Sequence, residues 1–339
     1  MNTIDLRSDT KTLPTPEMLE AMQAASLGDD QAGEDPTVNR LQDISADRLG
    51  MQSALLVLSG TMGNLISLLS QAQPGDEVIL GTTSHIFNNE AGGLSRFAGV
   101  IPRPLSEHYG ALNPEEVERT IKKKTTHTAK TSIVCIENSH NAAGGTVITP
   151  SQIDALAEVV HKHDLKLHCD GSRIFNAAVA MNLSPRDFTR NIDSLTFCLS
   201  KGLSCPLGAV ILGNQELIEE AKNWKQMLGG GMRQAGIIAA AGIVALEKMV
   251  DRLREDHATA RQLAEGFTKL NKDSLDMKTV QTNIVRFNTN AFGVSGNDFV
   301  SRLAQNGILT GPNRMVTHRH ITRNDVKYVV DTMVREFAG

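Results

Sequence analysis

Two charged side chains follow short apolar runs, and their types suit amine chemistry on a bound cofactor. Residues 165–169 read LKLHC and lead directly to Asp170, while residues 195–199 read LTFCL and lead to Lys201. A glycine follows each of the two charged residues. A lysine amine can form a Schiff base with an aldehyde, and a carboxylate can keep a pyridine nitrogen protonated. These are the residue types that hold pyridoxal phosphate.

The elements that position this pair are predicted to be strands. Short apolar runs that end in a turn are typical of buried parallel strands. Ligands of open α/β sheets bind beyond the carboxyl ends of the strands, so Asp170 and Lys201 are expected to face one crevice. The alternative is that both are surface charges at strand ends, because charged side chains are mostly exposed. The two runs by themselves leave both interpretations open.

Length and composition set the class of protein. The chain has 339 residues, of which 40% are hydrophobic, and it contains 28 glycines and a net charge of −4. This length allows a large core and two domains, and the composition fits an α/β protein. The small negative charge argues against a nucleic-acid or membrane surface.

The cysteines and histidines do not form a metal-ligand pattern. Three of the four cysteines lie in or beside apolar runs, and none has C-x-x-C spacing. We interpret them as buried free thiols in a reducing compartment. His318 and His320 would suit a metal pair, but no cysteine or carboxylate cluster accompanies them, so no metal site is expected. With neither a signal region nor a membrane-length apolar run, the expected location is the cytoplasm.

Five helices are predicted to begin at a capping residue followed by proline. The pairs are Thr15-Pro16, Asp35-Pro36, Asn113-Pro114, Thr149-Pro150 and Ser184-Pro185. Glu116 and Gln152 are placed to complete two of these starts as capping boxes. Together with the apolar runs, the helix starts predict a helix-rich α/β chain.

A glycine turn offers a place for a phosphate group. An apolar run ends in the SGT turn of residues 59–61, and a helical pattern follows. A strand, a glycine turn and a helix N-terminus form an anion site from backbone N–H groups and the helix dipole. The residues match neither the dinucleotide nor the nucleoside-triphosphate template, whereas a single phosphate monoester fits. A plain turn is the alternative. His85, after the next apolar run, has a position comparable to that of Asp170.

The character of the chain changes near residue 251. Residues 1–28 are expected to form an N-terminal arm and helix, residues 29–250 a large domain, and residues 251–339 a smaller α+β domain. The helix that follows the triple glycine of residues 229–231 is apolar nearly all round. Such a helix is buried in a core or in an interface. Because a monomer would struggle to cover it, a homo-oligomer is expected, at least a dimer and more specifically a tetramer.

Nine short motifs, taken together, resemble those of the low-specificity L-threonine aldolases. These belong to the β-eliminating lyase group of fold-type I pyridoxal phosphate enzymes. The motifs are DLRSDT at 5–10, GEDPT at 33–37, SGT at 59–61, SH at 84–85, ENSHN at 137–141, DGSRIFN at 170–176, LSKGL at 199–203, GGGMRQ at 229–234 and VTH at 316–318. The resemblance implies an aspartate aminotransferase-like large domain with a mainly parallel sheet, plus a smaller α+β C-terminal domain.

The resemblance also implies a role for each matching residue. The implied catalytic residues are Lys201, His85 and His127. The implied cofactor-binding residues are Gly60, Thr61, His85, Asp170, Arg173, Lys201 and, from a neighbouring subunit, Arg233. The implied substrate-binding residues are Ser8, His85, His127, Arg173 and Arg314. Two arginines suit a substrate carboxylate because guanidinium makes bidentate bonds to it.

The implied reaction is cleavage of a β-hydroxy-α-amino acid, L-threonine or L-allo-threonine, into glycine and an aldehyde. The base for the β-hydroxyl proton is left open between His85, His127 and a water molecule. The alternatives are a β-eliminating lyase or a racemase on the same cofactor, because one fold hosts many chemistries, and a non-catalytic α/β binding protein. Ala32, Asn89 and Gln226 depart from the expected pattern, which leaves the size and stereochemistry of the substrate open.

Overall fold

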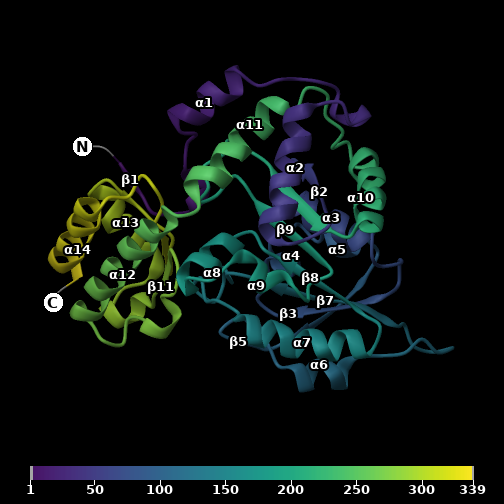
Figure 1. Ribbon diagram of the computed structural model, residues 1–339. Coiled ribbons are helices and arrows are strands. Elements are labelled where there is room, and N and C mark those ends of the chain that lie inside the picture. The colour runs from purple at the N-terminus through teal and green to yellow at the C-terminus, as the bar shows by residue number, and fades with distance from the viewer. Residues whose placement is uncertain (1–2, 338–339) are drawn as a thin grey trace.

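The structure is a computed structural model that describes residues 3–337, and a seven-stranded sheet lies at its centre (Figure 1). The strand order is β2-β10-β9-β8-β7-β3-β4. The strands are β2 (Ser53–Val57), β3 (Glu77–Gly81), β4 (Ile101–Leu105), β7 (Thr131–Glu137), β8 (Lys166–Asp170), β9 (Ser194–Cys198) and β10 (Ala209–Gly213). Pairing is parallel from β9 to β4, whereas β10 runs antiparallel to both of its neighbours. The predicted, mainly parallel sheet is confirmed.

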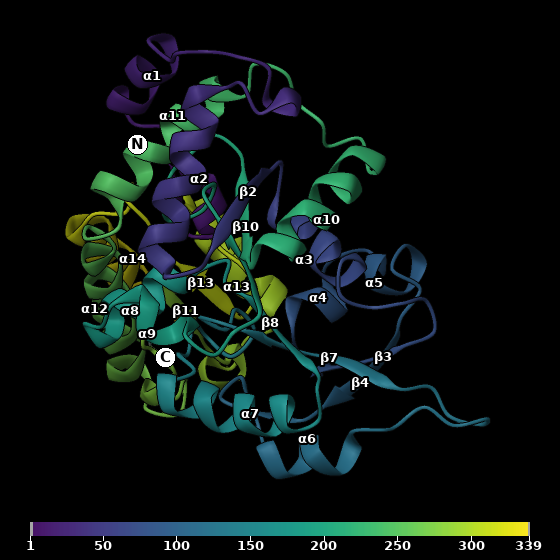
Figure 2. The same cartoon turned by 45° about the vertical axis from the view of Figure 1, so that its right-hand side comes forward.

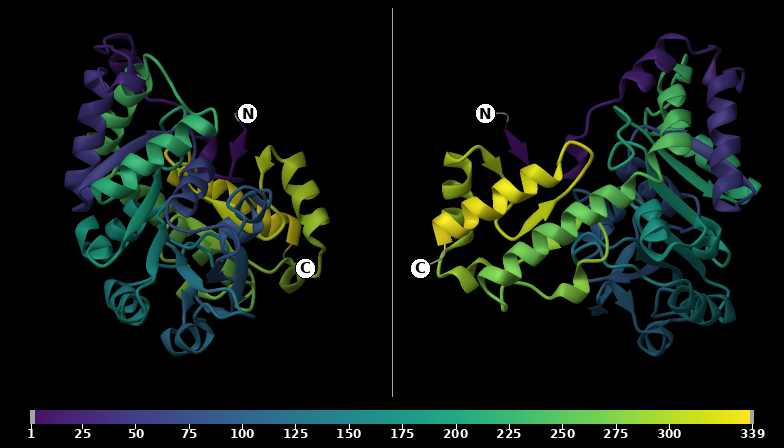
Figure 3. Two further views of the ribbon diagram at one scale, coloured as in Figure 1. Left: turned by 90° about the vertical axis from the view of Figure 1, so that its right-hand side faces the viewer. Right: turned by 60° about the vertical axis from the view of Figure 1, so that its left-hand side comes forward.

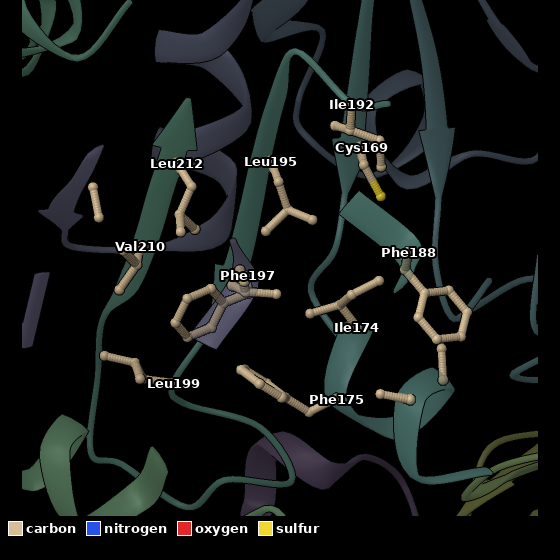
Figure 4. Packing of buried hydrophobic residues seen from close by; sticks show 14 of the residues in the cluster. Cys169, Ile174, Phe175, Phe188, Ile192, Leu195, Phe197, Leu199, Val210 and Leu212 are labelled. Carbon is tan, nitrogen blue, oxygen red and sulfur yellow. The ribbon is translucent and has the colours of Figure 1, made fainter. Parts of the chain in front are cut away.

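One face of this sheet is apolar. Leu195 and Phe197 of β9 pack with helices on this side, and the Phe175 and Phe197 rings meet edge to face with centroids 5.2 Å apart (Figure 4). The helices that contribute to this core are α2 (Pro36–Leu49), α7 (Pro150–Lys162), α8 (Ile174–Met181), α9 (Pro185–Thr189) and α11 (Gly236–Val244). Burial of these side chains away from water stabilises the large domain.

The opposite face is apolar at its edges and polar in the middle. The helices on this side are α3 (Gly60–Leu69), α4 (His85–Asn88), α5 (Gly93–Arg96) and α10 (Gln215–Met227) (Figure 2). Successive strand side chains point to opposite faces, so His168 and Asp170 of β8 share this face with their registered neighbours Ser194 and Thr196 of β9. All four side chains are buried.

A second core lies in the C-terminal part of the chain. Its helices are α12 (Leu253–Leu270), α13 (Gly296–Gln305) and α14 (Arg323–Phe337), and its short strands are β11 (Ile284–Arg286), β12 (Ile308–Leu309) and β13 (Arg314–Val316). Figure 3 shows α12 and α14 side by side, in green and yellow. Strand β1 (Ile4–Asp5) pairs with β12, so Ile4 and Leu6 join this core. The division at residues 28 and 250 stays a prediction.

All five predicted helix starts are confirmed, including α1 (Pro16–Gln23) and α6 (Pro114–Thr120), each with proline in its first turn. The capping box at Thr149 and Gln152 is confirmed. The box predicted at Glu116 is wrong, because the Asn113 side chain accepts from two backbone N–H groups and Glu116 makes no return bond. A second box forms instead at Ser184 and Asp187.

The remaining strands are a hairpin of β5 (Glu107–His108) and β6 (Ala111–Leu112). The four cysteines are buried and unpaired, as expected. Among residues 3–337, no helix is both long enough and apolar enough to cross a bilayer.

Candidate active site

Asp170 ends β8 and is a buried carboxylate with three hydrogen-bond donors around it. Its side chain is 1% exposed. One oxygen accepts hydrogen bonds from Ser172 N at 3.1 Å and Ser172 Oγ at 2.6 Å, and the other accepts from Asn64 Nδ2 at 3.1 Å. Burial raises the pKa of Asp170, but the Lys201 charge and the Ser172 hydrogen bonds outweigh it and lower the pKa below its ordinary value. The carboxylate is therefore held ionised.

Lys201 lies in the turn after β9, the strand next to β8, as the sequence predicts. The Thr12 hydroxyl, from the N-terminal arm, donates to the Lys201 carbonyl oxygen at 2.8 Å and holds the turn. The ammonium charge of Lys201 acts to lower the pKa values of Asp170, Asp9 and His85, so this amine lies near these three groups. Asp170 and Lys201 thus lie at the carboxyl ends of the adjacent strands β8 and β9. The surface-charge alternative fails for Asp170, because its side chain is buried.

His85 begins α4, beyond the carboxyl end of β3. Its backbone N–H donates to Glu137 Oε2 at 2.7 Å, and its Nδ1 lies 2.9 Å from Glu90 Oε1. Since an ionised carboxylate only accepts, Nδ1 carries the proton when Glu90 is ionised, which leaves Nε2 of a neutral ring with its lone pair. The hydrogen bond to Glu90 raises the pKa of His85, and burial raises the pKa of Glu90.

Asn64 joins the two buried carboxylates. Its Nδ2 donates to Glu90 Oε1 at 2.9 Å as well as to Asp170. A ring nitrogen of His85 and a carboxylate oxygen from each of Glu90 and Asp170 lie within 4.8 Å of one another. The Asn64 amide therefore links Asp170, which is expected to face the pyridine nitrogen, to Glu90, which orients His85.

The phosphate turn is built by Ser59 and Gly60 at the start of α3. Ser59 Oγ accepts from Met62 N at 3.2 Å and caps the helix. A Cβ at Gly60 would lie 2.7 Å from Cys198 Sγ and 3.4 Å from Ser172 Oγ, so only glycine allows α3 to approach β9 this closely. The first-turn N–H groups of a ten-residue helix, with Gly60 and Thr61, are suited to bind a phosphate.

The two arginines expected at the substrate carboxylate have different partners. Arg173 is buried and makes a bidentate ion pair with Asp9, with Nε–Oδ2 and Nη2–Oδ1 distances of 2.7 Å. Burial raises the pKa of Asp9, but the Arg173 charge outweighs it and lowers the pKa. A bidentate bond from Arg173 Nε and Nη2 to a substrate would require displacement of Asp9.

Arg314, unlike Arg173, forms no ion pair with another side chain among residues 3–337. It donates to Asn141 Oδ1 at 2.6 Å and to the Arg7 carbonyl oxygen at 3.1 Å, which are both uncharged acceptors. Burial, followed by the charge of nearby Arg173, lowers its pKa. Ser8, in the adjacent arm, accepts from the backbone N–H and the hydroxyl of Thr10. The carboxylate clamp predicted at Ser8, Arg173 and Arg314 is thus brought together, with Asp9 as an added member.

His127 and Arg233 are not brought to the site within one chain. His127 is exposed on the segment between α6 and β7, which extends away from the body (Figure 2). This segment precedes the amino end of β7, whereas Asp170 is level with Glu137 at the carboxyl end. Arg233 is exposed before α11 and pairs with Asp29 at 2.8 Å. A role for either residue at this site requires a second copy of the chain.

Sequence reasoning missed Glu90, Asn64 and Asp9 as members of the site. Asp9 belongs to the DLRSDT motif, and Asn64 follows the phosphate turn by one helical turn. The spacing of Gly60 and Asn64 on one helix face was the available signal for Asn64. Nothing in the sequence marks Glu90 as the partner of His85.

The fold and the site define a class: an α/β enzyme with an amine and an ionised carboxylate at adjacent carboxyl ends of a parallel sheet, beside a phosphate turn. The model of the family described as beta-eliminating lyase matches residues 5–290, and the chain belongs to this family.

The relatives extend over most of the chain. Low-specificity L-threonine aldolase 1 of Arabidopsis thaliana is 39% identical over 340 residues, which cover 97% of this chain and 95% of the relative. The low specificity L-threonine aldolase of Escherichia coli K12 is 43% identical over 277 residues, covering 81% and 82%. The solved structure of Leishmania major threonine aldolase superposes with a TM-score of 0.83 at 18% identity, covering 98% and 99%. The predictions of the family, of the fold type and of a pyridoxal phosphate lyase are confirmed.

One relative has another activity in its name. Alanine racemase TOXG of Cochliobolus carbonum is 31% identical over 339 residues, covering 96% of this chain and 86% of the relative. Membership of the family therefore has to be joined to the chemistry of the site before a reaction is assigned.

Proposed function

We propose that this chain is a pyridoxal phosphate-dependent aldolase that cleaves L-threonine and L-allo-threonine to glycine and acetaldehyde. One observation carries the proposal: the buried, ionised Asp170 ends β8 within 4.8 Å of a ring nitrogen of His85, and Lys201 follows the adjacent strand β9. The threonine aldolase names of relatives at 39–43% identity support this substrate.

The residues fit the cofactor. When bound, pyridoxal phosphate supplies an electron sink for the electrons of the bond that breaks at Cα. Lys201 would attach the aldehyde, Asp170 would hold the pyridine nitrogen protonated, and the start of α3 would bind the phosphate. The close packing at Gly60 leaves the backbone N–H groups of this turn uncovered by a side chain.

His85 is favoured as the residue that takes the β-hydroxyl proton. With Nδ1–H held by an ionised Glu90, Nε2 of the neutral ring has the lone pair that could accept a proton. A positioned base of this kind contributes about 10²–10⁴-fold to a rate. His127 and a bound water are the other candidates from the sequence, and His127 is remote within one chain.

The clamp would fix which bond is cleaved. Arg314, whose hydrogen bonds go to uncharged acceptors, would offer its positive charge to the substrate carboxylate, and Ser8 would offer a hydroxyl beside it. Arg173 would act on this region through its ion pair with Asp9. A carboxylate held at this edge would restrict how the other substituents of Cα are presented to the bound cofactor.

We further propose that the chain works as a homo-oligomer, a tetramer with shared active sites, in the cytoplasm. Leu13, Leu19 and Ile237 are 65%, 55% and 40% exposed on and beside the packed pair α1 and α11, which is an apolar surface for a second copy. Arg233 and His127 would then serve a neighbour's site. Light scattering that finds an active monomer would reject this.

Mixed oligomers test the sharing directly. Copies with Lys201→Ala and copies with Arg233→Ala are each expected to be impaired. After mixing and subunit exchange, some sites would combine an intact Lys201 with an intact Arg233 from the other copy, so activity should rise above that of either variant. No rise in verified mixed oligomers would place Arg233 outside the neighbour's site.

The reaction itself is tested by its products. Each isomer of threonine is incubated with protein and pyridoxal phosphate, and glycine, acetaldehyde, 2-oxobutanoate and ammonia are assayed. The proposal expects glycine and acetaldehyde in equal amounts, with the allo isomer consumed at least as fast. Dominant 2-oxobutanoate and ammonia would show a dehydrating lyase. Formation of D-threonine isomers without glycine would show a racemase.

A further inference from the structure

A continuous chain of buried hydrogen bonds runs beneath the polar middle of the sheet. Gln71 Nε2 donates to Ser194 Oγ at 2.7 Å, and Ser194 Oγ lies 2.8 Å from His168 Nδ1. His168 Nε2 lies 3.2 Å from Asn64 Oδ1, and Asn64 Nδ2 reaches Asp170. His168 and Ser194 are 0% exposed and Asn64 is 1% exposed, so water does not compete for these bonds.

The chemistry of the groups fixes the direction of every bond. Glu90 and Asp170 accept, so the amide nitrogen of Asn64 must face them and its oxygen must face His168. An amide oxygen only accepts, so His168 carries its proton on Nε2. Burial lowers the pKa of His168 to about 4, outweighing the charge of Asp170. The ring is therefore neutral, and its Nδ1 accepts from the Ser194 hydroxyl.

A wrong tautomer of His168 would disturb both carboxylates. A proton on Nδ1 would leave Nε2 as an acceptor facing the Asn64 oxygen, another acceptor. The amide would then gain by turning over, and its oxygen would face two carboxylates. A buried polar group without its hydrogen-bond partner destabilises the protein by the full desolvation penalty of that group. The ring nitrogen of His168 that is protonated thus decides whether Asp170 and Glu90 keep the hydrogen bonds from the Asn64 amide.

We propose that His168 is a positioning residue for the reaction: as an Nε2–H donor, backed by Ser194, it fixes the Asn64 amide that holds both Asp170 and Glu90. This inference rests on the proposed function, because it assigns a task to a residue remote from the reacting atoms. His168 acts on the cofactor through Asp170 and on His85 through Glu90.

Neighbouring groups do not offer His168 another role. Cys135 is its registered neighbour on β7, and burial raises the pKa of that thiol. Thr196, two residues after Ser194 on the same face, has a buried hydroxyl without a partner among residues 3–337. Thr196 lies beside the hydrogen-bonded chain but is not part of it, which makes it a matched control.

The first test reads the tautomer without cofactor or reaction. In protein free of pyridoxal phosphate, ¹⁵N NMR of the imidazole ring should show His168 neutral and protonated at Nε2 from about pH 6 to pH 8, where an ordinary histidine titrates. Thr196→Val should keep this signature. Ser194→Ala should shift the ring toward a mixture of tautomers. An Nδ1–H form or a charged ring in the wild-type protein would overturn the proposal.

The second test reads cofactor affinity. Ser194→Ala removes the hydroxyl that donates to His168 and accepts from Gln71, and the lost bond to His168 should weaken pyridoxal phosphate binding roughly 2- to 10-fold; His168→Phe should weaken it more. Thr196→Val should bind as the wild type does. Unchanged affinity in Ser194→Ala, with its tautomer already mixed, would overturn the proposal even if His168→Phe fails to fold. Glycine formation by the wild-type protein is measured alongside, so a failure of the proposed function is seen separately.

Discussion

The two faces of the central sheet are built from the same strands and serve different ends. On β8, Leu167 and Cys169 belong to the apolar core, whereas His168 and Asp170 face α3. The apolar side is held by many small contacts, so its residues are exchangeable in kind. The polar side depends on a few directed hydrogen bonds, each with a donor and an acceptor that cannot be swapped. Stability and chemistry are thus separated across one strand.

The largest expected effect is on the apolar face. Phe197→Ala removes a fully buried ring that packs on Phe175, and such truncations cost about 3–5 kcal/mol of folding free energy. Urea unfolding of the cofactor-free variant measures this cost. The surviving folded protein should keep a near-normal kcat. A large loss of kcat with unchanged stability would contradict the separation of the two faces.

On the polar face, Asp170→Asn should show the reverse. The variant keeps the shape of the side chain but loses the charge that faces the expected pyridinium. Removal of a preorganised electrostatic group typically lowers kcat about 10²–10³-fold, while the loss of stability should be smaller than for Phe197→Ala. Steady-state kinetics and urea unfolding on one preparation decide the point. A fully active Asp170→Asn protein would refute the assigned role.

Glu90→Gln tests the polar face through the pH dependence of kcat/KM. The hydrogen bond to Glu90 raises the pKa of His85, so the neutral, base-competent ring forms only at a higher pH than for a free imidazole. Without the carboxylate this pKa falls, and the acid limb of kcat/KM should move to lower pH. Glu118→Gln, at an exposed pair with Lys162, is the control. An acid limb that stays in place would exclude His85 as the titrating base.

The smallest effect is expected for His127, which belongs to neither face of the central sheet. If His127 reaches a neighbour's substrate hydroxyl, His127→Asn should change the ratio of kcat/KM for L-threonine and L-allo-threonine by about 2- to 10-fold, the worth of one hydrogen bond. His161→Asn, at an exposed position of α7, should leave the ratio unchanged. Equal ratios in wild type and His127→Asn would remove His127 from substrate recognition.

The sequence was sufficient to predict those features that depend on residues adjacent in the chain. Asp170 and Lys201 were found because each follows an apolar run, and the helix at Pro150 was found because its cap and proline are adjacent. The partners of the polar face lie far apart in the chain: Asn64 and Asp170 are separated by 106 positions, and Asp9 and Arg173 by 164. No periodicity predicts such pairs. The antiparallel direction of β10 likewise depends on tertiary pairing and not on its apolar run.

The position of His127 shows that a correct prediction of the neighbouring strand does not place a residue at the site. Its place before a strand was predicted correctly, but being before a strand means the amino end, while the site occupies the carboxyl end. A motif match assigns a role without saying which copy of the chain fulfils it. The structure of a single chain shows that His127 lies before the amino end of β7, away from Asp170 of its own copy.

The central claim is that Lys201, beside Asp170, is the amine that binds the cofactor. Borohydride reduction of wild-type protein loaded with pyridoxal phosphate, followed by peptide mapping, tests it most directly. The account predicts one pyridoxyl-modified peptide, with the label on Lys201, and no such label in Lys201→Ala. A label on any other lysine in the wild-type protein would contradict it.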